Sequence, residues 1–361
     1  MKKIICICNT YYQLIFALQL KKTVYANDYI ALLLSDHSKN ALSICRNLEQ
    51  YKCFDEIKYV ETKSIDYSFS LNPYAGNKAI KQILKKIKVD CFDEMLVFNL
   101  SKSTYLFFSH FCKRNIHIKV HRFEEGVLSY NTQICKLIPL TSSLHVNRLI
   151  YPLLKFFRKY DMMAKLEKFY CYYPEIYNGN LHAEKIPLIQ VRSDVAEIVA
   201  GAFGVNGCEL KYEEKYIFFT SVYDFEGGEA IGELELVRKI ADVVGKDNLL
   251  IKMHPRDTRT VYADEGFHID TNSSIPFEAL LFAHDFSDKV LLTATSGAVL
   301  SASLMIENPP KTYYMYPLCK LYGNPTAKKT VEQIDDVLCH GSVRDKMKQI
   351  HICSGVCDII C

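Results

Sequence analysis

The sequence lacks the features that would place it in several special classes of protein. Its 44 Lys and Arg nearly balance 41 Asp and Glu over 361 residues, which is untypical of nucleic-acid-coating or disordered chains. Its most apolar long window, 290–306, is interrupted by threonines, serines and a glycine that a membrane-spanning helix would rarely carry together. We therefore expect no nucleic-acid partner and no bilayer-spanning helix, and we interpret this stretch as a strand, a turn and a buried helix.

A secretory leader and a metal-binding cysteine pattern are also missing. The sequence passes from Met1 and two lysines directly into the strand-like segment Ile4–Cys8, so we expect a cytoplasmic protein. Its 14 cysteines include no C-x-x-C pair and no Cys/His zinc spacing, which predicts reduced, buried thiols. Cys353, Cys357 and Cys361 have the spacing of one helical face, so a metal or cluster at this tail stays an alternative.

Strand-like runs alternate with amphipathic stretches through the first half of the chain. The expected strand and helix pairs are 4–8 with 11–22, 29–34 with 40–51, 56–60 with 78–87 and 94–100 with 104–114, followed by a strand at 116–123. Strands that are separated by helices pair in parallel through right-handed crossovers. We therefore expect a doubly wound sheet.

The alternation restarts in the second half, after a connection rich in Pro, Gly and Asn. The expected strands are 216–221, 249–253, 290–294 and 312–316, and the expected helices are 229–244, 276–284 and 297–307. A chain of this length suits two cores, so we expect an α/β protein with two domains, 1–185 and 186–361. The basic and aromatic stretch 146–168 is interpreted as an amphipathic interdomain helix, with contact to an anionic membrane surface as the alternative.

The strand at 249–253 ends in a His-Pro step. Pro255 cannot donate to a sheet and biases His254 toward extended geometry, so the imidazole emerges where open α/β sheets bind ligands. Lys252 and Arg256 add cationic donors that suit a phosphate. A structural role for the histidine at the strand end is the alternative.

Two later segments also suit a nucleotide. Glu278 lies in the first turn of a helix expected to begin at Pro276 after a capping serine, and its carboxylate either stabilises that helix start or accepts hydrogen bonds from ribose hydroxyls. Thr295, Ser296 and Gly297 join a strand to a helix. The N–H groups and hydroxyls there either form a phosphate cradle or simply cap the helix.

An acidic turn, Glu124-Glu125-Gly126, follows the strand expected at 116–123. The glycine permits a tight turn that projects one carboxylate into a cleft while the other stays structural. A carboxylate near apolar surface gains the basicity needed to take a hydroxyl proton. An exposed acidic turn is the alternative from the local sequence.

In this order, the segments resemble the bacterial sialyltransferases of glycosyltransferase family 52, the lipooligosaccharide sialyltransferase type, with kinship to the bacterial polysialyltransferases. That family shares an acidic-acidic-Gly motif, a His-Pro motif and a paired hydroxyl motif, which here are Glu124-Glu125-Gly126, His254-Pro255 and Thr295-Ser296. The opening Cys8–Leu14 is also similar to the family's first strand and turn. Tyr12 replaces a common proline there, and Thr295 replaces a common serine.

The resemblance implies a GT-B architecture of two facing Rossmann-like domains. The first would receive a glycan acceptor, and the second would hold the donor, sialic acid linked to cytidine monophosphate (CMP-sialic acid). Transfer would invert the anomeric carbon without a metal or cofactor, and the sequence contains no Asp-x-Asp donor-metal motif. The acceptor-side residues would be Glu124, Asn9, Thr10 and Tyr11. The donor-binding residues would be Lys252, Pro255, Arg256, Glu278, Thr295, Ser296 and Gly297.

Catalysis would require one group that meets the departing phosphate and one base for the acceptor hydroxyl. The resemblance assigns His254 to the phosphate and leaves Glu125 and Asp224 as alternative bases. The expected acceptor is a terminal galactoside of a surface polysaccharide or lipooligosaccharide. A hexosyltransferase using a uridine diphosphate sugar, a nucleotide-sugar epimerase of the same fold and a catalytically dead assembly module are the alternatives. Peripheral contact with the inner membrane face and a homodimer stay open.

Overall fold

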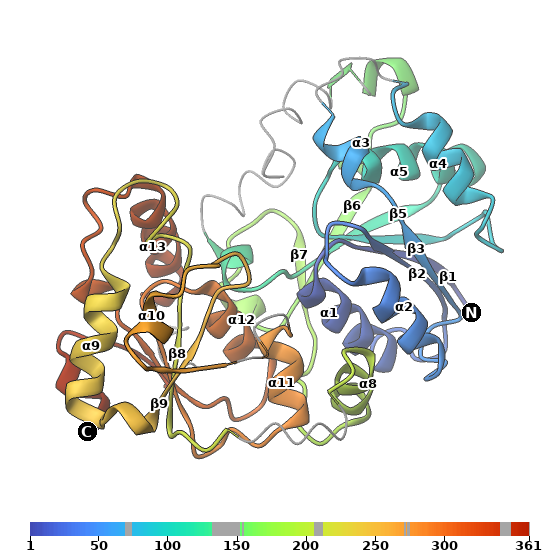
Figure 1. Cartoon of the computed structure of the whole chain (residues 1–361). Coiled ribbons are helices and arrows are strands. Elements are labelled where there is room, and N and C mark those ends of the chain that lie inside the picture. The colour runs from blue at the N-terminus through green and yellow to red at the C-terminus, as the bar shows by residue number, and fades with distance from the viewer. Residues whose placement is uncertain are drawn as a thin grey trace. The chain divides into compact units, whose positions relative to one another are not determined.

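The computed structural model describes residues 1–68, 74–131, 152–153, 155–205, 212–270, 272, 275–339 and 348–360. The chain forms two compact units, each built on a parallel sheet flanked by helices (Figure 1). The first unit comprises Met1–Glu125, Thr132–Ile189 and Ser193–Gly204. The second comprises Gly126–Asn131, Gln190–Arg192 and Val205–Cys361.

The first unit has a seven-stranded sheet in the order β3-β2-β1-β4-β5-β6-β7. Its strands are β1 (Lys3–Cys8), β2 (Tyr29–Ser35), β3 (Glu56–Val60), β4 (Glu94–Val97), β5 (Lys119–Phe123), β6 (Leu166–Cys171) and β7 (His182–Lys185). Its helices are α1 (Tyr11–Lys22), α2 (Ala41–Glu49), α3 (Lys63–Tyr67), α4 (Asn77–Leu84), α5 (Lys102–Arg114) and α8 (Asp194–Ala202). The strand order reverses between β1 and β4, and ligands bind such sheets beyond the carboxyl ends of the strands at this switch point.

Helices cover both faces of the first sheet. In Figure 1, α1, α2 and α8 lie on one side of the sheet, and α3, α4 and α5 lie on the other. This cover explains why β1 and β2 are nearly continuous apolar runs, with both faces buried. On the α5 side the core includes Ile5, Leu33, Val97, Phe107 and Phe111.

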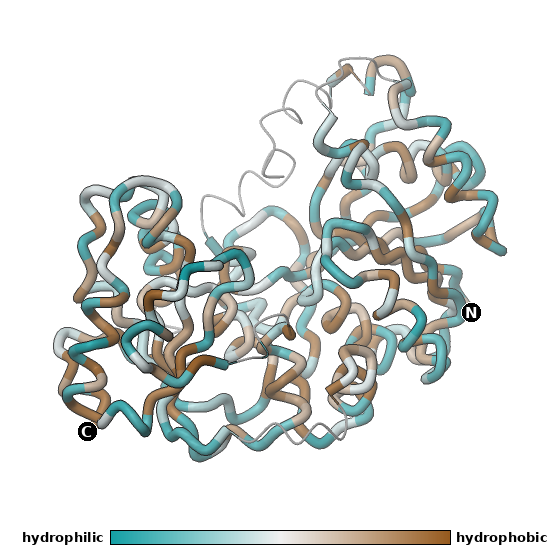
Figure 2. The backbone as a smooth tube through the Cα atoms, viewed as in Figure 1, coloured by the Kyte–Doolittle hydropathy of each residue, from teal (hydrophilic) through white to brown (hydrophobic). Residues whose placement is uncertain are grey.

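The second unit has a six-stranded sheet in the order β10-β9-β8-β11-β12-β13, with its switch point between β8 and β11. Its strands are β8 (Tyr216–Phe219), β9 (Leu249–Lys252), β10 (His268–Ile269), β11 (Val290–Thr293), β12 (Lys311–Tyr314) and β13 (Ile350–Ile352). Its helices are α9 (Glu233–Val244), α10 (Val261–Asp264), α11 (Phe277–Ala283), α12 (Gly297–Met305) and α13 (Pro325–Leu338). Figure 2 shows apolar residues gathered along the strands of both units.

The predicted alternation of strands and helices is confirmed, and both sheets are parallel and doubly wound. Helix α1 and strand β3 have the predicted bounds. The short strands β6, β7, β10 and β13 and the helices α3, α8, α10 and α13 were not predicted from the pattern. No helix among the described residues is both long and apolar enough to cross a membrane.

The helix expected at 146–168 is wrong in its last part. Its residues 146–151 and 154 lie outside the described residues, and helical residues 155–158 are followed by Lys159, whose φ of +61° is left-handed. Residues Leu166–Cys171 instead form β6, which pairs in parallel with β5. Pairing with β5 and burial of Phe169 and Cys171 outweigh the helical pattern there.

The alternative of a helical cysteine face at the tail is also wrong. Cys353 is buried directly after strand β13, and Cys357 is exposed in a 3₁₀ turn at Val356–Ile360. Cys361 lies outside the described residues. Within the described part of the chain, no group of three or more His, Cys, Asp or Glu side chains is arranged to hold a metal ion.

Candidate active site

His254 lies just beyond the carboxyl end of β9, as the His-Pro step predicts. Its backbone N–H donates to Thr220 Oγ1 at 2.8 Å, and the backbone N–H of Arg256 donates to His254 Nδ1 at 3.1 Å. Since Nδ1 accepts a hydrogen bond, the neutral imidazole carries its proton on Nε2. The backbone therefore fixes the tautomer in which Nε2 is the hydrogen-bond donor.

The two cations near His254 have carboxylate partners. Lys252 Nζ lies 2.6 Å from Asp270 Oδ2, and both side chains are buried. Burial lowers the pKa of Lys252, and the Asp270 carboxylate opposes this shift. Arg256 pairs with Glu226 at 2.8 Å on the surface, next to the exposed Pro255. Neither partner was predictable from the local sequence, and the expected phosphate contacts of these residues stay predictions.

Helix α12 begins without a side-chain cap, at the carboxyl end of β11. Thr293 Oγ1 donates to the Phe219 carbonyl at 3.0 Å and accepts from Ser296 N at 2.8 Å, which fixes the turn. Ser296 occupies the N-cap position, but its side chain makes no capping hydrogen bond. Thr295 Oγ1 is buried without a partner among the described residues, and a Cβ at Gly297 would meet open space. This helix start therefore offers N–H groups and an unused hydroxyl to an anion.

Glu278 is buried in the first turn of α11. Burial raises the pKa of Glu278 to about 7, although its own backbone N–H and the charge of Lys252 lower it. The helix begins at Phe277, so Pro276 lies at the N-cap and not at the first helical position. The serines expected as caps, 273 and 274, lie outside the described residues.

Asp224 caps a helix in the second unit. Its Oδ1 accepts hydrogen bonds from the backbone N–H groups of Gly232 at 2.9 Å and Glu233 at 3.2 Å, at the start of α9. The adjacent Glu233 is fully buried and accepts from Ser221 N, and burial raises its pKa to about 8. The Asp224 carboxylate therefore stabilises the N-terminus of α9 through these hydrogen bonds, a role that the local sequence did not indicate.

The two acids of the acidic-Gly turn have different surroundings in the first unit. Glu124 is wholly buried, with Oε1 accepting from Tyr12 Oη at 2.5 Å and Oε2 accepting from Tyr172 N at 3.0 Å. These bonds tie β5 to α1 and to the end of β6. The contacts favour a structural role for Glu124, and Tyr12, which replaces the family's proline, supplies one of them.

Glu125 has the environment of a tuned base. Its side chain is partly exposed and accepts hydrogen bonds from Thr10 and Gln13, while Arg122 adds a favourable charge. Burial nevertheless dominates and raises the pKa of Glu125 to about 7. A carboxylate with this pKa is about half ionised at neutral pH, which suits proton transfer from a hydroxyl.

The glycine of the turn is required by its backbone and its packing. Gly126 has a φ of +77°, and a Cβ there would lie 2.2 Å from Ser301 Oγ of α12, within the second unit. Any other residue would be strained and would displace Ser301. Close packing against α12, the helix that begins at Gly297, therefore explains why the acidic-acidic-Gly motif ends in a glycine.

The opening turn after β1 is held by internal hydrogen bonds. Thr10 Oγ1 accepts from Gln13 N at 3.3 Å and caps α1, and Asn9 N donates to Gln13 Oε1 at 2.6 Å. Tyr11 donates to the Lys39 carbonyl, and its ring packs edge-on against Phe203 at 5.0 Å. The structure thus brings Thr10 and Glu125 together, and it gives Asn9 and Tyr11 partners within the unit.

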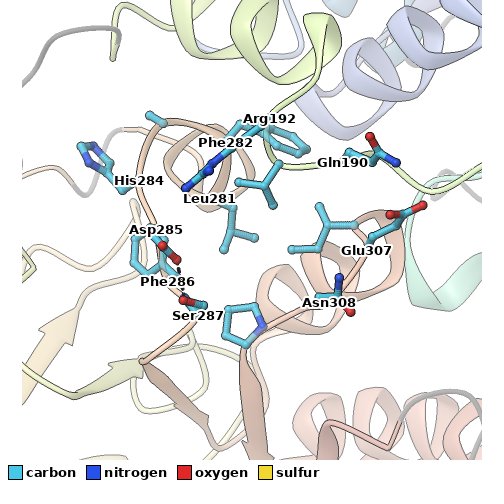
Figure 3. A pocket seen from close by; sticks show the side chains of 14 residues that line it. Gln190, Arg192, Leu281, Phe282, His284, Asp285, Phe286, Ser287, Glu307 and Asn308 are labelled. Carbon is cyan, nitrogen blue, oxygen red and sulfur yellow. Dashed lines mark hydrogen bonds between the residues drawn. The ribbon is translucent and has the colours of Figure 1, made fainter.

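A cavity of about 590 Å³ lies near the amino ends of strands β11 and β12 in the second unit (Figure 3). It is lined by the end of α11, by the Asp285–Ser287 turn before β11, and by the Ile306–Pro310 connection before β12. The candidate donor-binding residues follow the carboxyl ends of β9 and β11 or, like Glu278, lie in the first turn of α11. The cavity therefore contains none of them.

Two Rossmann-like units with a switch point in each are the building blocks of the GT-B fold, which is common among glycosyltransferases. Over 99% of its length, the chain is similar to an alpha/beta-galactoside alpha-2,3-sialyltransferase from the luminous marine bacterium Photobacterium phosphoreum, at 12% identity, 98% coverage of that chain and a TM-score of 0.51. A UDP-glucosyltransferase from Polygonum tinctorium is similar over 99% of this chain and 88% of its own, at 10% identity and a TM-score of 0.52. At these identities the two structures show the fold alone.

The family model of the alpha-2,8-polysialyltransferases (POLYST) matches residues 4–315, and the chain belongs to this family. No curated protein matches the sequence significantly. The expected kinship with the bacterial polysialyltransferases is confirmed, and the protein is a glycosyltransferase that transfers sialic acid. Family membership separates it from the hexosyltransferases and epimerases considered as alternatives.

Proposed function

We propose that the protein transfers sialic acid from CMP-sialic acid to a glycan, with inversion and without a metal ion. The observation that carries this proposal is the start of α12. A buried hydroxyl without a partner is rare in folded proteins, and Thr295 provides one beside an uncapped helix N-terminus. A phosphate oxygen would accept hydrogen bonds from both, and the helix dipole would favour its negative charge.

His254 supplies the second group for the departing phosphate. The hydrogen bond from Arg256 N to Nδ1 keeps the Nε2 proton in place as a donor before the reaction begins. Such a preorganised donor stabilises charge that develops in the transition state more than charge already present in the bound donor. In this proposal His254 and α12 provide what a divalent ion provides in other glycosyltransferases.

Glu125 is the base that we assign to the acceptor hydroxyl. Its pKa of about 7 matches the task, and Thr10 and Gln13 orient its carboxylate. Asp224 is the weaker candidate because its Oδ1 holds the first N–H groups of α9. Deprotonation of the acceptor oxygen accompanies its attack on the anomeric carbon, and the bond from that carbon to the phosphate oxygen breaks, which inverts the centre in one displacement.

Glu278 is assigned to the ribose of the donor. Two hydrogen bonds from ribose hydroxyls would stabilise its ionised form inside the unit. Replacing Glu278 with Ala should weaken donor binding by about 2–4 kcal/mol with little change in melting temperature. An unchanged donor affinity would return Glu278 to the role of stabilising the start of α11.

The acceptor is proposed to be a terminal sugar of a surface glycan. The similar Photobacterium enzyme is named for galactosides, whereas the family description names an alpha-2,8 polysialyl linkage. The first name favours a terminal galactose, and the second favours a terminal sialic acid. The test of acceptors therefore includes glycans that end in galactose and glycans that end in sialic acid.

A cytoplasmic location with peripheral membrane contact also belongs to the proposal. Phe156 and Phe157 are exposed beside Lys155 and Lys159, which suits an anionic headgroup surface. Cosedimentation with anionic lipid vesicles, reduced in a Phe156→Ser/Phe157→Ser variant and by added salt, would support it. Equal binding of both proteins to neutral and anionic vesicles would contradict it.

The test of the function uses purified protein with CMP-sialic acid or a uridine diphosphate sugar, with and without galactoside and sialylated acceptors. We expect release of cytidine monophosphate and a sialylated product that depend on an acceptor. Turnover of a uridine diphosphate sugar, with CMP-sialic acid left intact under all conditions, would overturn the proposal.

A further inference from the structure

A second polar cluster lies at the carboxyl edge of the first sheet, around its switch point. Asn9 follows β1, Ser35 ends β2, and Asn99 follows β4. Ser35 Oγ donates to Asn9 Oδ1 at 2.8 Å, and Asn9 Nδ2 donates to Asn99 Oδ1 at 3.2 Å. These bonds join three neighbouring strand ends at the place where a doubly wound sheet binds a ligand.

His37 is held rigidly beside this cluster. The Ser35 hydroxyl donates its proton to Asn9 Oδ1. Its oxygen therefore accepts a hydrogen bond from His37 Nδ1 at 2.9 Å. His37 Nε2 lies 3.5 Å from Asp66 Oδ2, and the buried Asp66 is fixed in turn by Ser103 N at 2.7 Å and Ser103 Oγ at 2.8 Å. The hydrogen bond at Nδ1 and the packing of Nε2 against the fixed Asp66 side chain hold the imidazole in place.

Tyr67, the last residue of α3, packs on this fixed imidazole. The ring centroids of His37 and Tyr67 are 5.7 Å apart with a tilt of 35°, and Tyr67 remains 59% exposed. An exposed aromatic face on a rigid support is suited to the apolar C–H face of a sugar ring. Asn99 provides a donor for a sugar hydroxyl, because its Nδ2 makes no hydrogen bond to any described residue.

The cluster is connected to the proposed base through α1. Asn9 N donates to Gln13 Oε1, and the Gln13 side chain hydrogen-bonds to Glu125. The same short segment therefore organises the polar cluster and the carboxylate that takes the acceptor proton. A neutral polyol suits this combination of an amide donor and an aromatic face better than a phosphate does, since Asp66 lies directly behind the imidazole.

We infer that Tyr67 and Asn99 form a binding subsite for the acceptor sugar, with His37 as the positioning residue for the Tyr67 ring. This inference rests on the proposed function and deepens it. Tyr67 contacts the face of the sugar ring, and Asn99 Nδ2 donates to one of its hydroxyls. The subsite binds the acceptor and takes no part in binding the nucleotide.

The test compares steady-state constants for Tyr67→Ala, Tyr67→Phe and Asn99→Ala with those of the wild type. Tyr322→Ala is the matched control, because Tyr322 is 95% exposed and lies in the second unit. We expect the acceptor KM to rise roughly threefold to tenfold in Tyr67→Ala and in Asn99→Ala, as for one lost interaction each. Tyr67→Phe and Tyr322→Ala should keep the wild-type value, and the donor KM and acceptor-free donor hydrolysis should stay unchanged in all four.

An unchanged acceptor KM in Tyr67→Ala and Asn99→Ala, with melting temperatures equal to that of the wild type, would overturn the subsite. An equal rise in donor KM would also overturn it. If the wild type itself transfers no sialic acid, the proposed function fails separately. Calorimetric titration of a galactoside and a sialoside into wild type and Tyr67→Ala then tests the subsite directly, and equal heats in the two proteins would contradict it.

Discussion

The two units differ in how completely they satisfy the polar groups next to the proposed catalytic residues. In the first unit, Glu124 and Thr10 have internal hydrogen-bond partners, and burial raises the pKa of the neighbouring Glu125 carboxylate. In the second unit, α12 starts without a side-chain cap and Thr295 keeps a buried hydroxyl unpaired. Satisfied polar neighbours suit a carboxylate that transfers a proton, whereas unpaired donors at a helix start suit binding of an anion.

The largest effect is expected at His254 in the second unit. His254→Ala should lower turnover by roughly 10²–10⁴-fold, because a preorganised donor to the leaving phosphate is lost. Turnover per folded molecule should be measured together with the melting curve. His284→Ala, a second histidine in the same unit, is the control and should retain normal turnover. Near-normal turnover in a destabilised His254→Ala protein would show that this histidine is structural.

The next effect separates the two candidate bases. Glu125→Gln should lower turnover by roughly 10²-fold or more, whereas Asp224→Asn should leave it nearly unchanged, since Asn caps a helix as well as Asp does. The pH dependence of kcat/KM tests the same assignment of the base independently. Wild-type kcat/KM should rise with pH until about 7, where Glu125 ionises. The reverse ranking of the two variants would move the base to Asp224.

Glu125 should also affect stability with a defined sign. Its folded-state pKa of about 7 lies above the ordinary value of 4.5, so the folded state retains the proton more strongly than the unfolded chain does. Its contribution to stability is therefore fully present below pH 4.5 and is lost as the pH rises through about 7. Chemical unfolding at pH 5 and pH 8 should show a smaller decline in Glu125→Gln than in the wild type. An identical decline in both would contradict this environment for Glu125.

A smaller effect is expected at Thr295, where donor affinity should fall without a loss of stability. Thr295→Val removes a donor to the phosphate and should lower donor affinity about tenfold, yet it also removes an unpaired buried hydroxyl and should not lower the melting temperature. Thr293→Val is the matched control. Thr293 Oγ1 donates one hydrogen bond and accepts another within the second unit. The loss of both should destabilise the protein by about 1–3 kcal/mol. A loss of stability in Thr295→Val with unchanged donor affinity would contradict the cradle.

Long apolar runs and local caps made much of the fold predictable from sequence. Helix α1 has its predicted bounds because Thr10 caps it and the chain before it is an unbroken buried strand. Strand β10 was missed because it has only two residues, and strand β6 was missed because its first three residues include two charged ones and are not buried. Lys159 ends the expected helix because its backbone is left-handed, a conformation that a lysine in the sequence does not predict.

The positions of the candidate residues were also predictable, but their partners were not. The His-Pro step and the Thr-Ser-Gly turn locate His254 and Thr295 at strand ends through local rules alone. The contacts of Lys252 with Asp270, and of Glu124 with Tyr172, join residues far apart in the sequence. Charge and hydrogen-bond capacity can be read from a sequence, whereas the group that satisfies them depends on tertiary packing.

The most direct test of the account is turnover of CMP-sialic acid in the presence of excess chelator. In the proposed mechanism His254 and the start of α12 stabilise the charge on the departing phosphate, so wild-type turnover should be unchanged by the chelator. Added magnesium or manganese should not restore activity to His254→Ala. Loss of wild-type turnover on chelation, recovered by either ion, would contradict the central claim that groups of the protein itself stabilise the leaving phosphate.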